Sequence, residues 1–236
     1  MKIITWNCNM AFRKKWNSML KFNPDIIVIQ ECENECKYQQ IQKIPGYNEF
    51  IWIGDNLNKG IGIISFNNYH IEISQNYSEE YKYVVPVKVT GESEFNLFAI
   101  WAMPHEKIRL KGYVGQIWDA VKFYELELNS KSILVGDWNS NVKWDHERPN
   151  GNHSSIVNLL DEFNIVSIYH TIKLEKQGEE REPTLYLLKN EKKPFHIDYC
   201  FASKTMISKK TTINVGKYDN WIQVSDHMPL IIDNLG

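Results

Sequence analysis

The sequence predicts an α/β fold in which strands outnumber helices. Eight short apolar segments are rich in β-branched and aromatic residues, which favours strand over helix. Three other segments carry helical periodicity or a helix-boundary signal. Successive strands without an intervening helix, as across residues 61–101, argue against a simple doubly wound parallel sheet.

The expected strands are the apolar segments themselves. In chain order they cover residues 3–6, 26–30, 62–66, 84–89, 97–101, 133–135, 197–201 and 228–232. Around two of them, residues 25–31 and 132–137 form apolar runs without clean alternation, which predicts burial on both faces.

Helical spacing is clearest over residues 110–128. There Leu110, Val114, Ile117, Val121 and Leu128 fall on one face at 3.6-residue spacing. A second helix is expected over residues 154–163. A third is expected over residues 14–22, ending before Asn23-Pro24 because the residue before a proline avoids the helical region. The charged, glycine-containing stretch 175–182 is expected to be an exposed loop.

Length and composition indicate one globular domain spanning residues 1–236. The formal net charge of −2 gives no global basic field, so nucleic-acid binding would need a local basic patch. The four cysteines form no paired zinc pattern and are expected to be reduced. No apolar run approaches the roughly 20 residues that span a bilayer, and the N-terminus lacks signal-peptide features. We therefore expect a cytoplasmic monomer without membrane contact.

Polar residues recur at the ends of the apolar strands. They are Asn7, Glu31, Asp137 with Asn139, Asp198, and Asp226 with His227. Strand ends are rigid and open toward solvent, which suits groups that must hold a fixed geometry. Any one of these residues taken alone is more often a turn former or a helix cap. Their joint occurrence predicts an active site.

The motifs around these residues resemble those of a known superfamily. They are Thr5-Trp6-Asn7, Gln30-Glu31, Gly136-Asp137-Trp138-Asn139-Ser140, His196-Ile197-Asp198-Tyr199 and Ser225-Asp226-His227-Met228-Pro229-Leu230. Their order is similar to that in the endonuclease/exonuclease/phosphatase superfamily, which includes exonuclease III-like abasic endonucleases, DNase I-like nucleases, RNA deadenylases, and sphingomyelin and inositol-phosphate phosphatases. The resemblance extends from Thr5 to Leu230 and is nearest to the abasic-endonuclease branch.

This resemblance implies a four-layer sandwich of two packed mixed β-sheets flanked by helices, the DNase I-like fold. It implies that Glu31 is the main Mg²⁺ ligand, with Asn7 beside it and Mn²⁺ as an alternative ion. The resemblance also assigns catalytic roles: Asp137 would orient or deprotonate the attacking water, and Asn139 would hold a phosphate oxygen and position Asp137.

His227 completes the expected site. By the same resemblance it would contact the scissile phosphate, with Asp226 or Asp198 oriented toward it. Phosphodiester hydrolysis itself needs an activated water and neutralisation of the charge that builds on phosphate. Magnesium prefers hard oxygen ligands, and a histidine beside a carboxylate can stay protonated and donate to phosphate. The residue types in this pattern therefore suit that chemistry without reference to relatives.

The sequence departs from the superfamily pattern in one strand. Ala102 stands near the position where many branches carry a histidine. His105, just beyond, either substitutes for that histidine or is merely exposed. Tyr113 begins a segment similar to the Tyr-x-x-x-Trp-Asp motif of the abasic-endonuclease branch, with one extra residue in the spacing. Tyr113 therefore has two open roles, at the scissile phosphate or in helix packing.

Substrate contacts are the least determined part of the site. The candidates are Trp138, Asn141 and His105. A tryptophan there could stack on a base or simply form a wall of the site.

Three functions compete. The first is a Mg²⁺-dependent nuclease acting on DNA, which we favour. The second is a phosphatase or phosphodiesterase acting on RNA or a small phosphate ester. The third is a binding module that has kept the fold without activity, and the intact set of polar strand-end residues argues against it.

Overall fold

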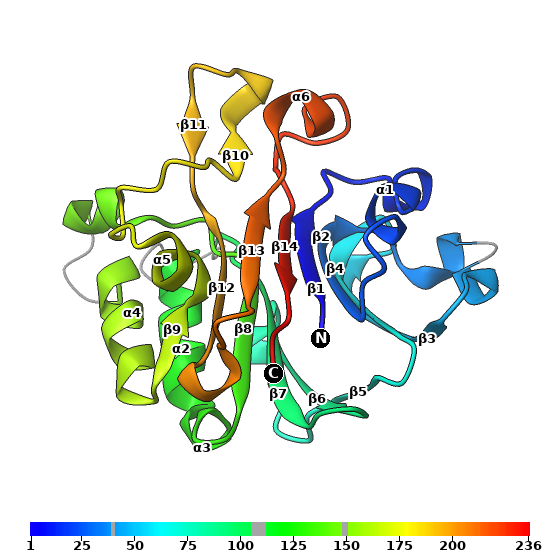
Figure 1. Cartoon of the computed structure of the whole chain (residues 1–236), viewed down its shortest axis with the longest axis horizontal. Coiled ribbons are helices and arrows are strands. Elements are labelled where there is room, and N and C mark those ends of the chain that lie inside the picture. The colour runs from blue at the N-terminus through cyan, green and yellow to red at the C-terminus, as the bar shows by residue number, and fades with distance from the viewer. Residues whose placement is uncertain (39–40, 105–111, 148–150) are drawn as a thin grey trace.

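The computed structural model describes residues 1–38, 41–104, 112–147 and 151–236. Two six-stranded sheets dominate it (Figure 1). Sheet A contains, in spatial order, β13 (Thr212–Val215), β14 (Leu230–Asp233), β1 (Ile3–Asn7), β2 (Ile26–Cys32), β4 (Lys59–Phe66) and β3 (Tyr47–Asn56). Sheet B contains β5 (His70–Ile73), β6 (Val84–Thr90), β7 (Phe95–Trp101), β8 (Ser132–Asp137), β12 (Asp198–Ser203) and β9 (Ile165–Ser167). A separate two-stranded ribbon pairs β10 (Leu185–Tyr186) with β11 (Pro194–Phe195).

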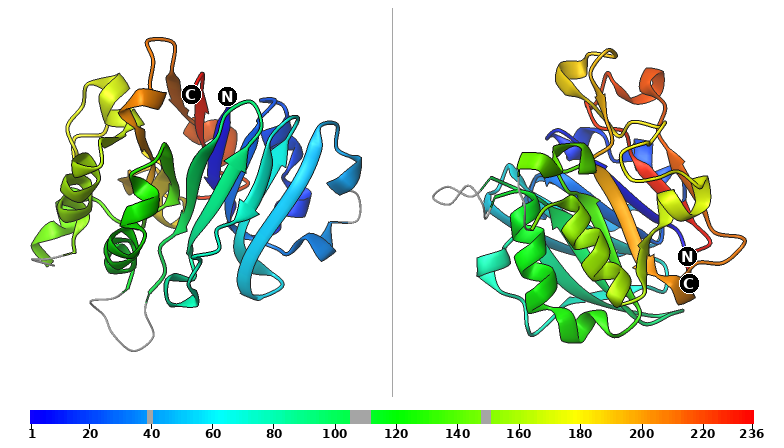
Figure 2. Two further views of the ribbon diagram at one scale, coloured as in Figure 1. Left: turned by 90° about the horizontal axis from the view of Figure 1, so that it is seen from below. Right: turned by 90° about the vertical axis from the view of Figure 1, so that its left-hand side faces the viewer.

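Both sheets are mixed. The pairs β1–β2 and β7–β8 run parallel, and their neighbours pair antiparallel. Each sheet also packs helices on its outer face (Figure 2). The helices are α1 (Asn17–Leu20), α2 (Val114–Phe123), α3 (Glu125–Leu128), α4 (His153–Glu162), α5 (Ile168–Lys173) and α6 (Tyr218–Trp221). Short 3₁₀ turns cover Phe12–Lys14, Glu35–Lys37, Ile41–Lys43, Glu79–Tyr81, Val142–Glu147, Leu187–Lys189 and Lys204–Met206.

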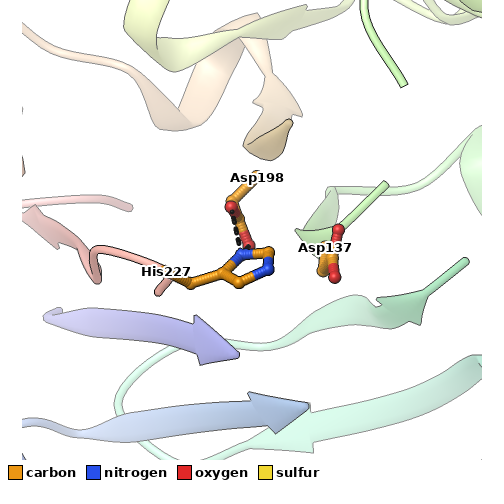
Figure 3. Close-up of side chains that lie close together, drawn as sticks. All are labelled: Asp137, Asp198 and His227. Carbon is orange, nitrogen blue, oxygen red and sulfur yellow. Dashed lines mark hydrogen bonds and ion pairs between the residues drawn. The ribbon is translucent and has the colours of Figure 1, made fainter. Parts of the chain in front are cut away.

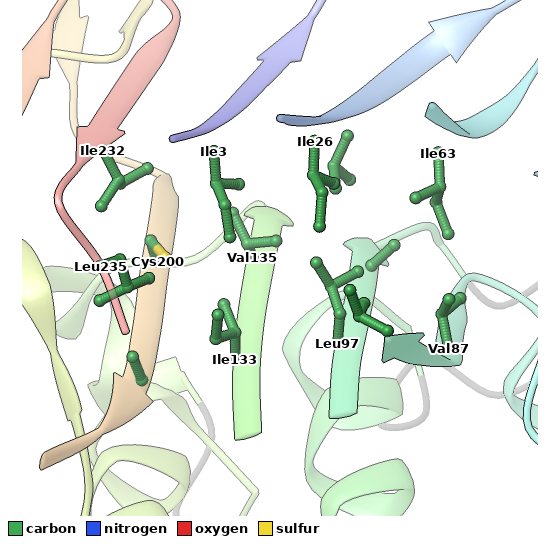
Figure 4. Packing of buried hydrophobic residues seen from close by; sticks show 14 of the residues in the cluster. Ile3, Ile26, Ile63, Val87, Leu97, Ile133, Val135, Cys200, Ile232 and Leu235 are labelled. Carbon is green, nitrogen blue, oxygen red and sulfur yellow. The ribbon is translucent and has the colours of Figure 1, made fainter. Parts of the chain in front are cut away.

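Alternating side chains build three apolar layers. Ile3 and Ile26 point between the sheets, where they meet residues of sheet B such as Leu97 and Val135 (Figure 4). The next residues along β1 and β2 face the opposite side and pack beneath α1 and α6. Residues of α2 and α4 pack on the outer face of sheet B around Trp138. The arrangement is the four-layer DNase I-like sandwich that the resemblance implied.

The eight expected strands are all present, and most extend a residue or more beyond the expected bounds. Six strands, β3, β5, β9, β10, β11 and β13, were not expected from the sequence. In β3 only the middle, Phe50–Ile53, is a continuous apolar run, and its residues are half-buried because the strand lies at the edge of sheet A. Polar residues in these strands interrupt the apolar pattern by which the other strands were predicted.

The three expected helices differ in how well they agree with the structure. The expected helix at 154–163 is α4. The expected helix at 110–128 begins at Val114 and breaks at Tyr124 into α2 and α3, and Leu110 lies outside the described residues. The expected helix at 14–22 was wrong in length: a 3₁₀ turn at Phe12–Lys14 precedes α1, which has four residues.

Topology brings distant strand ends together at one edge of the sandwich. The parallel strands β1 and β2 end side by side, with Asn7 opposite Gln30. In sheet B, Asp137 at the end of β8 lies opposite Asp198 at the start of β12. Because β14 runs antiparallel to β1, the residues just before β14 reach the same edge. Among the described residues, no helix is long and apolar enough to cross a membrane.

Candidate active site

Three buried side chains form the centre of the site. They are Asp137, Asp198 and His227, and one ligand atom from each lies within 4.8 Å of the others. The Nδ1 atom of His227 is 2.9 Å from Oδ2 of Asp198 and 3.2 Å from Oδ1. Figure 3 shows the imidazole ring between the Asp198 and Asp137 carboxylates. The arrangement places one cationic group between two acids.

Burial and charge set the protonation states of this group. Burial lowers the pKa of His227, but the carboxylates of Asp198 and Asp137 outweigh that effect and raise it to about 10. Burial raises the pKa of Asp137, and the negative charge of Asp198 raises it further. At neutral pH His227 is therefore a charged donor, and Asp137 is a carboxylate of increased basicity.

Asp137 is held by amide donors. Asn7 Nδ2 donates to Oδ2 of Asp137 at 3.0 Å. The backbone N–H of Asn139 donates to Oδ1 at 3.0 Å, and its side-chain amide donates to Oδ2 at 3.2 Å. The same Asn139 amide donates to the carbonyl of Ala102 at 3.0 Å, which fixes its orientation. Asn139 thus holds the Asp137 carboxylate in place, and its contact with a phosphate oxygen stays a prediction.

The backbone before Asp137 requires glycine. Gly136 has a φ of +147°, and a Cβ built there would lie 1.9 Å from the carbonyl oxygen of Ile100. Only a residue without a side chain allows β7 and β8 to approach this closely. The Gly-Asp pair of the motif thus has a packing cause as well as a chemical one.

Glu31 projects from a β-bulge. Gln30 pairs with Ile61 and Cys32 pairs with Gly60, so Glu31 is the extra residue of β2. Its φ of 59° lies in the left-handed region, which bulges at functional sites often adopt. Its Oε1 lies 3.2 Å from Nζ of Lys59 and 3.5 Å from Nδ2 of Asn7. The bulge turns the carboxylate toward Asn7.

Two donor sets could take a divalent cation. Asp137, Asp198 and His227 are close enough, but a histidine that is protonated between two carboxylates has no lone pair on Nδ1 to offer. Glu31 supplies carboxylate oxygens, and its side chain remains 20% exposed. Asn7 turns its amide nitrogen toward Glu31 and Asp137, and its oxygen accepts from the N–H of Asn9 at 3.1 Å. Hard oxygen donors with room for water suit Mg²⁺, so the residues at Glu31 fit this ion.

Asp226 is hydrogen-bonded to Asn9. Its Oδ1 accepts a hydrogen bond of 3.0 Å from the side-chain amide of Asn9. Of the two acids that the resemblance offered as partners of His227, it is therefore Asp198 that contacts the ring.

Two predicted substrate contacts were wrong. Trp138 is fully buried and stacks on Phe201 with ring centroids 4.7 Å apart, so it cannot stack on a base. Asn141 is also buried, and its amide donates to the carbonyl of His196 and the hydroxyl of Tyr199 while its oxygen accepts from Lys143 N–H. Both residues support the fold beneath the site.

The remaining two candidates lie in the segment before α2. His105 falls outside the described residues. Tyr113 is 39% exposed, with a backbone φ of 48° and ψ of −121°. Its N–H donates to the carbonyl of Met103 at 2.6 Å, which ties the start of α2 to the end of the β7 segment. The position of Tyr113 leaves its predicted contact with phosphate open.

Sequence reasoning missed Thr184. This fully buried residue accepts hydrogen bonds at its hydroxyl from the N–H groups of Ile197 and Asp198, at 2.9 Å and 3.0 Å. Its carbonyl accepts from Met228 N–H at 2.6 Å. One residue thus fixes the backbone on both sides of the Asp198–His227 pair. A buried threonine before a two-residue strand carries no periodic signal, and its spacing from His196-Ile197-Asp198 is the sequence feature that could have pointed to it.

Comparison with known proteins places this geometry in a family. The sequence model of the Endonuclease/Exonuclease/phosphatase family matches residues 4–227. The chain belongs to that family. It is therefore a hydrolase of phosphate esters. A search of curated proteins finds no match.

Solved structures show the same fold at low identity. The 3'-5' exonuclease NExo from Neisseria meningitidis is 19% identical over 99% of each chain, with a TM-score of 0.67. An AP endonuclease from Archaeoglobus fulgidus is 18% identical over 98% of each chain, with a TM-score of 0.69. TDP2 from D. rerio, complexed with a single-strand DNA product, is 16% identical over 98% of this chain and 97% of its own, with a TM-score of 0.66.

Proposed function

We propose that this family member is a Mg²⁺-dependent phosphodiesterase that cleaves DNA. The observation that carries the proposal is the line of hydrogen-bonded groups at the sandwich edge: Glu31 beside Asn7, Asn7 donating to Asp137, and the imidazole of His227 between Asp137 and Asp198. It combines a cation ligand, a base and a charged donor within one site.

Asp137 acts on the attacking water. Its carboxylate has a raised pKa, so it accepts a proton more readily than an ordinary aspartate. Asn7 and Asn139 hold its two oxygens in place, which fixes the direction from which water approaches phosphate. An amide does not take up a proton at neutral pH, which leaves Asp137 as the base.

His227 stabilises the phosphate. Its pKa of about 10 keeps it protonated, so a ring N–H can donate to a phosphate oxygen as negative charge builds there. Asp198 keeps the ring oriented and charged. Glu31 would hold Mg²⁺, with Asn7 beside it, and the bound ion would neutralise phosphate charge.

The choice of DNA rests on the structural neighbours. NExo from Neisseria has been solved bound to a product DNA hairpin, and D. rerio TDP2 with a single-strand DNA product. Each covers nearly the whole of this chain, so the present protein has the same framework around its site. This supports DNA over a small phosphate ester.

A substrate panel with Mg²⁺ tests the proposal. It contains abasic duplex, nicked duplex, single-stranded DNA, RNA and soluble phosphate esters, each with and without chelator. We expect hydrolysis of a DNA substrate that chelator abolishes and that Mn²⁺ restores. Turnover of RNA or soluble esters alone would replace DNA as the substrate class.

A matched pair of variants tests the site. Asp137→Asn should lose roughly 10²–10⁴-fold in turnover and keep its melting temperature, because one catalytic carboxylate is lost. Asp145→Asn is the control, since Asp145 accepts from the N–H groups of His153 and Ser154 at the start of α4 and lies outside the site. It should lose stability and keep turnover. Glu31→Gln should shift the Mg²⁺ midpoint to much higher concentration, and an unchanged midpoint would exclude Glu31 as a ligand.

A further inference from the structure

Lys59 is a second positive group at the site. Its Nζ lies 3.2 Å from Oε1 of Glu31, which in turn lies 3.5 Å from the Asn7 amide that donates to Asp137. Lys59 therefore stands at one end of a line of contacting groups, and His227 stands at the other. The two cations flank the carboxylates between them.

The hairpin of β3 and β4 holds Lys59 in this place. Lys59 is the first residue of β4 and pairs with Asn56 across the turn. The next residue, Gly60, pairs with Cys32 directly after the Glu31 bulge. The bulge and the hairpin end thus meet, and the ammonium reaches Glu31 from the neighbouring strand.

The ring of Trp101 contacts the Lys59 ammonium. The ammonium lies 5.3 Å from the centroid of the Trp101 ring, a cation–π distance. Trp101 is buried and pairs with Asp137 in sheet B. The Lys59 side chain stays 37% exposed, so its head group lies against the site and remains open to solvent.

An ordinary surface ion pair would have no further role, since exposed pairs contribute little stability. This pair differs because its acid is the proposed Mg²⁺ ligand. Glu31 cannot serve a divalent cation and the ammonium equally, because like charges a few ångströms apart repel. The flexible four-carbon stem allows the ammonium to move while Trp101 keeps it close.

We infer that Lys59 is a substrate-binding residue: its ammonium pairs with Glu31 in the metal-free site, leaves that carboxylate when a divalent cation binds there, and then contacts a phosphate oxygen of the substrate. The inference rests on the proposed function in one respect, the assignment of Glu31 as the metal ligand. It adds to His227 a second charged contact, at the other end of this line of contacting groups.

The test uses Lys59→Met, Lys59→Arg and a control, Lys204→Met. Methionine keeps an unbranched apolar stem against Trp101 and removes the charge. Lys204 pairs with Asp161 at 2.9 Å on the surface, so its variant removes an ion-paired lysine away from the site. Calorimetry measures the binding of Mg²⁺ alone, and of inorganic phosphate at saturating Mg²⁺. Steady-state kinetics on the DNA substrate are recorded across a salt series.

Lys59→Met should bind Mg²⁺ several-fold more tightly, because Glu31 loses its competing cation, and should bind phosphate about tenfold more weakly. Its KM should rise with little change in kcat, and the salt dependence of log kcat/KM should become shallower by about 0.7–0.9. Lys59→Arg should restore phosphate binding, and Lys204→Met should match the parent protein.

Two results would overturn the inference. Weaker Mg²⁺ binding in Lys59→Met would show that the ammonium positions Glu31 for the metal and does not compete with it. Unchanged phosphate binding and KM would show that the ammonium never reaches the substrate. The calorimetric arms need no DNA cleavage, so they separate this inference from the proposed function. If DNA is not hydrolysed while both binding changes occur, the substrate proposal fails and the role of Lys59 stands.

Discussion

Asp198 holds His227 through both carboxylate oxygens, 2.9 Å and 3.2 Å from Nδ1. Both side chains are buried, so solvent screens their attraction little. The pair joins β12 of sheet B to the segment before β14 of sheet A, and it keeps the imidazole charged across the neutral range.

The first prediction removes that charge. In Asp198→Asn the burial of His227 is no longer balanced by the carboxylate, so the pKa of His227 should fall from about 10. Turnover at neutral pH should fall and should decline further as pH rises, because the neutral ring donates to phosphate less strongly. NMR titration of the ring, beside a pH–rate profile, measures both effects. A ring that stays protonated with turnover unchanged would contradict the role of Asp198.

Thr184 gives a second prediction. Thr184→Val keeps the shape but removes the acceptor of the N–H groups of Ile197 and Asp198, which stay buried. The free energy of unfolding should fall by about 1–3 kcal/mol for unsatisfied buried donors. We expect kcat to fall with KM kept, since Asp198 shifts and substrate binding does not depend on it. Thr184→Ser, which restores the hydroxyl, should recover kcat. A loss of stability alone, with kcat intact, would limit Thr184 to a structural role.

Tyr113 gives a third. Its φ of 48° and ψ of −121° are ordinarily adopted by glycine in tight turns, so the tyrosine is held at some cost in strain. Tyr113→Gly should raise the melting temperature, whereas Tyr113→Phe should leave it unchanged. If the hydroxyl reaches the scissile phosphate, both variants lose turnover. Full turnover in Tyr113→Phe would assign the residue to the turn instead, and His105→Ala, measured in parallel, would then test the loop histidine.

The fourth prediction concerns stability in acid. Burial lowers the pKa of His153 from 6.5 to about 4. Its two ring nitrogens form hydrogen bonds with the side chains of Ser140 and Gln177. In the unfolded chain His153 is protonated below about pH 6.5, whereas in the folded chain it is protonated only below about pH 4. This contribution to stability is complete above 6.5 and is lost as pH falls through that window, by up to about 3 kcal/mol.

His153→Gln removes this titration. The free energy of unfolding, measured by urea denaturation between pH 7 and pH 4, should decline less steeply in the variant than in the parent. Equal slopes would mean that the pKa of His153 does not differ between the folded and unfolded protein.

Much of the site was predictable because its residues end apolar strands. Asp137 and Glu31 follow runs of buried residues. A carboxylate at the end of a buried strand indicates a functional group. The resemblance to the superfamily limited the partner of His227 to two acids, Asp226 and Asp198. The choice between them needed the register of β12 against β8, which no local pattern contains.

Other parts were not predictable for physical reasons. Trp138 follows Asp137, and the turn of the backbone after β8 sends it into the core under α4 and not into the site. Lys59 is a lysine beside a hairpin turn, which on sequence alone indicates a solvated surface. Glu180, in the segment expected to be an exposed loop, has its side chain 1% exposed and hydrogen-bonded to His170. For Lys59 and Glu180, the charge of the side chain did not predict its environment, because tertiary partners compensate for burial.

The site lies on the seam between the two sheets. Asn7, Glu31 and His227 come from sheet A or its connections, whereas Asp137 and Asp198 come from sheet B. Neither sheet alone holds both the proposed cation ligand and the proposed base. The rate of hydrolysis therefore reports how the two sheets are aligned. A chain refolding from denaturant should regain its secondary structure before its activity. A smaller side chain in the shared core, for example at Val135, should misalign the catalytic groups of the two sheets before it unfolds either sheet.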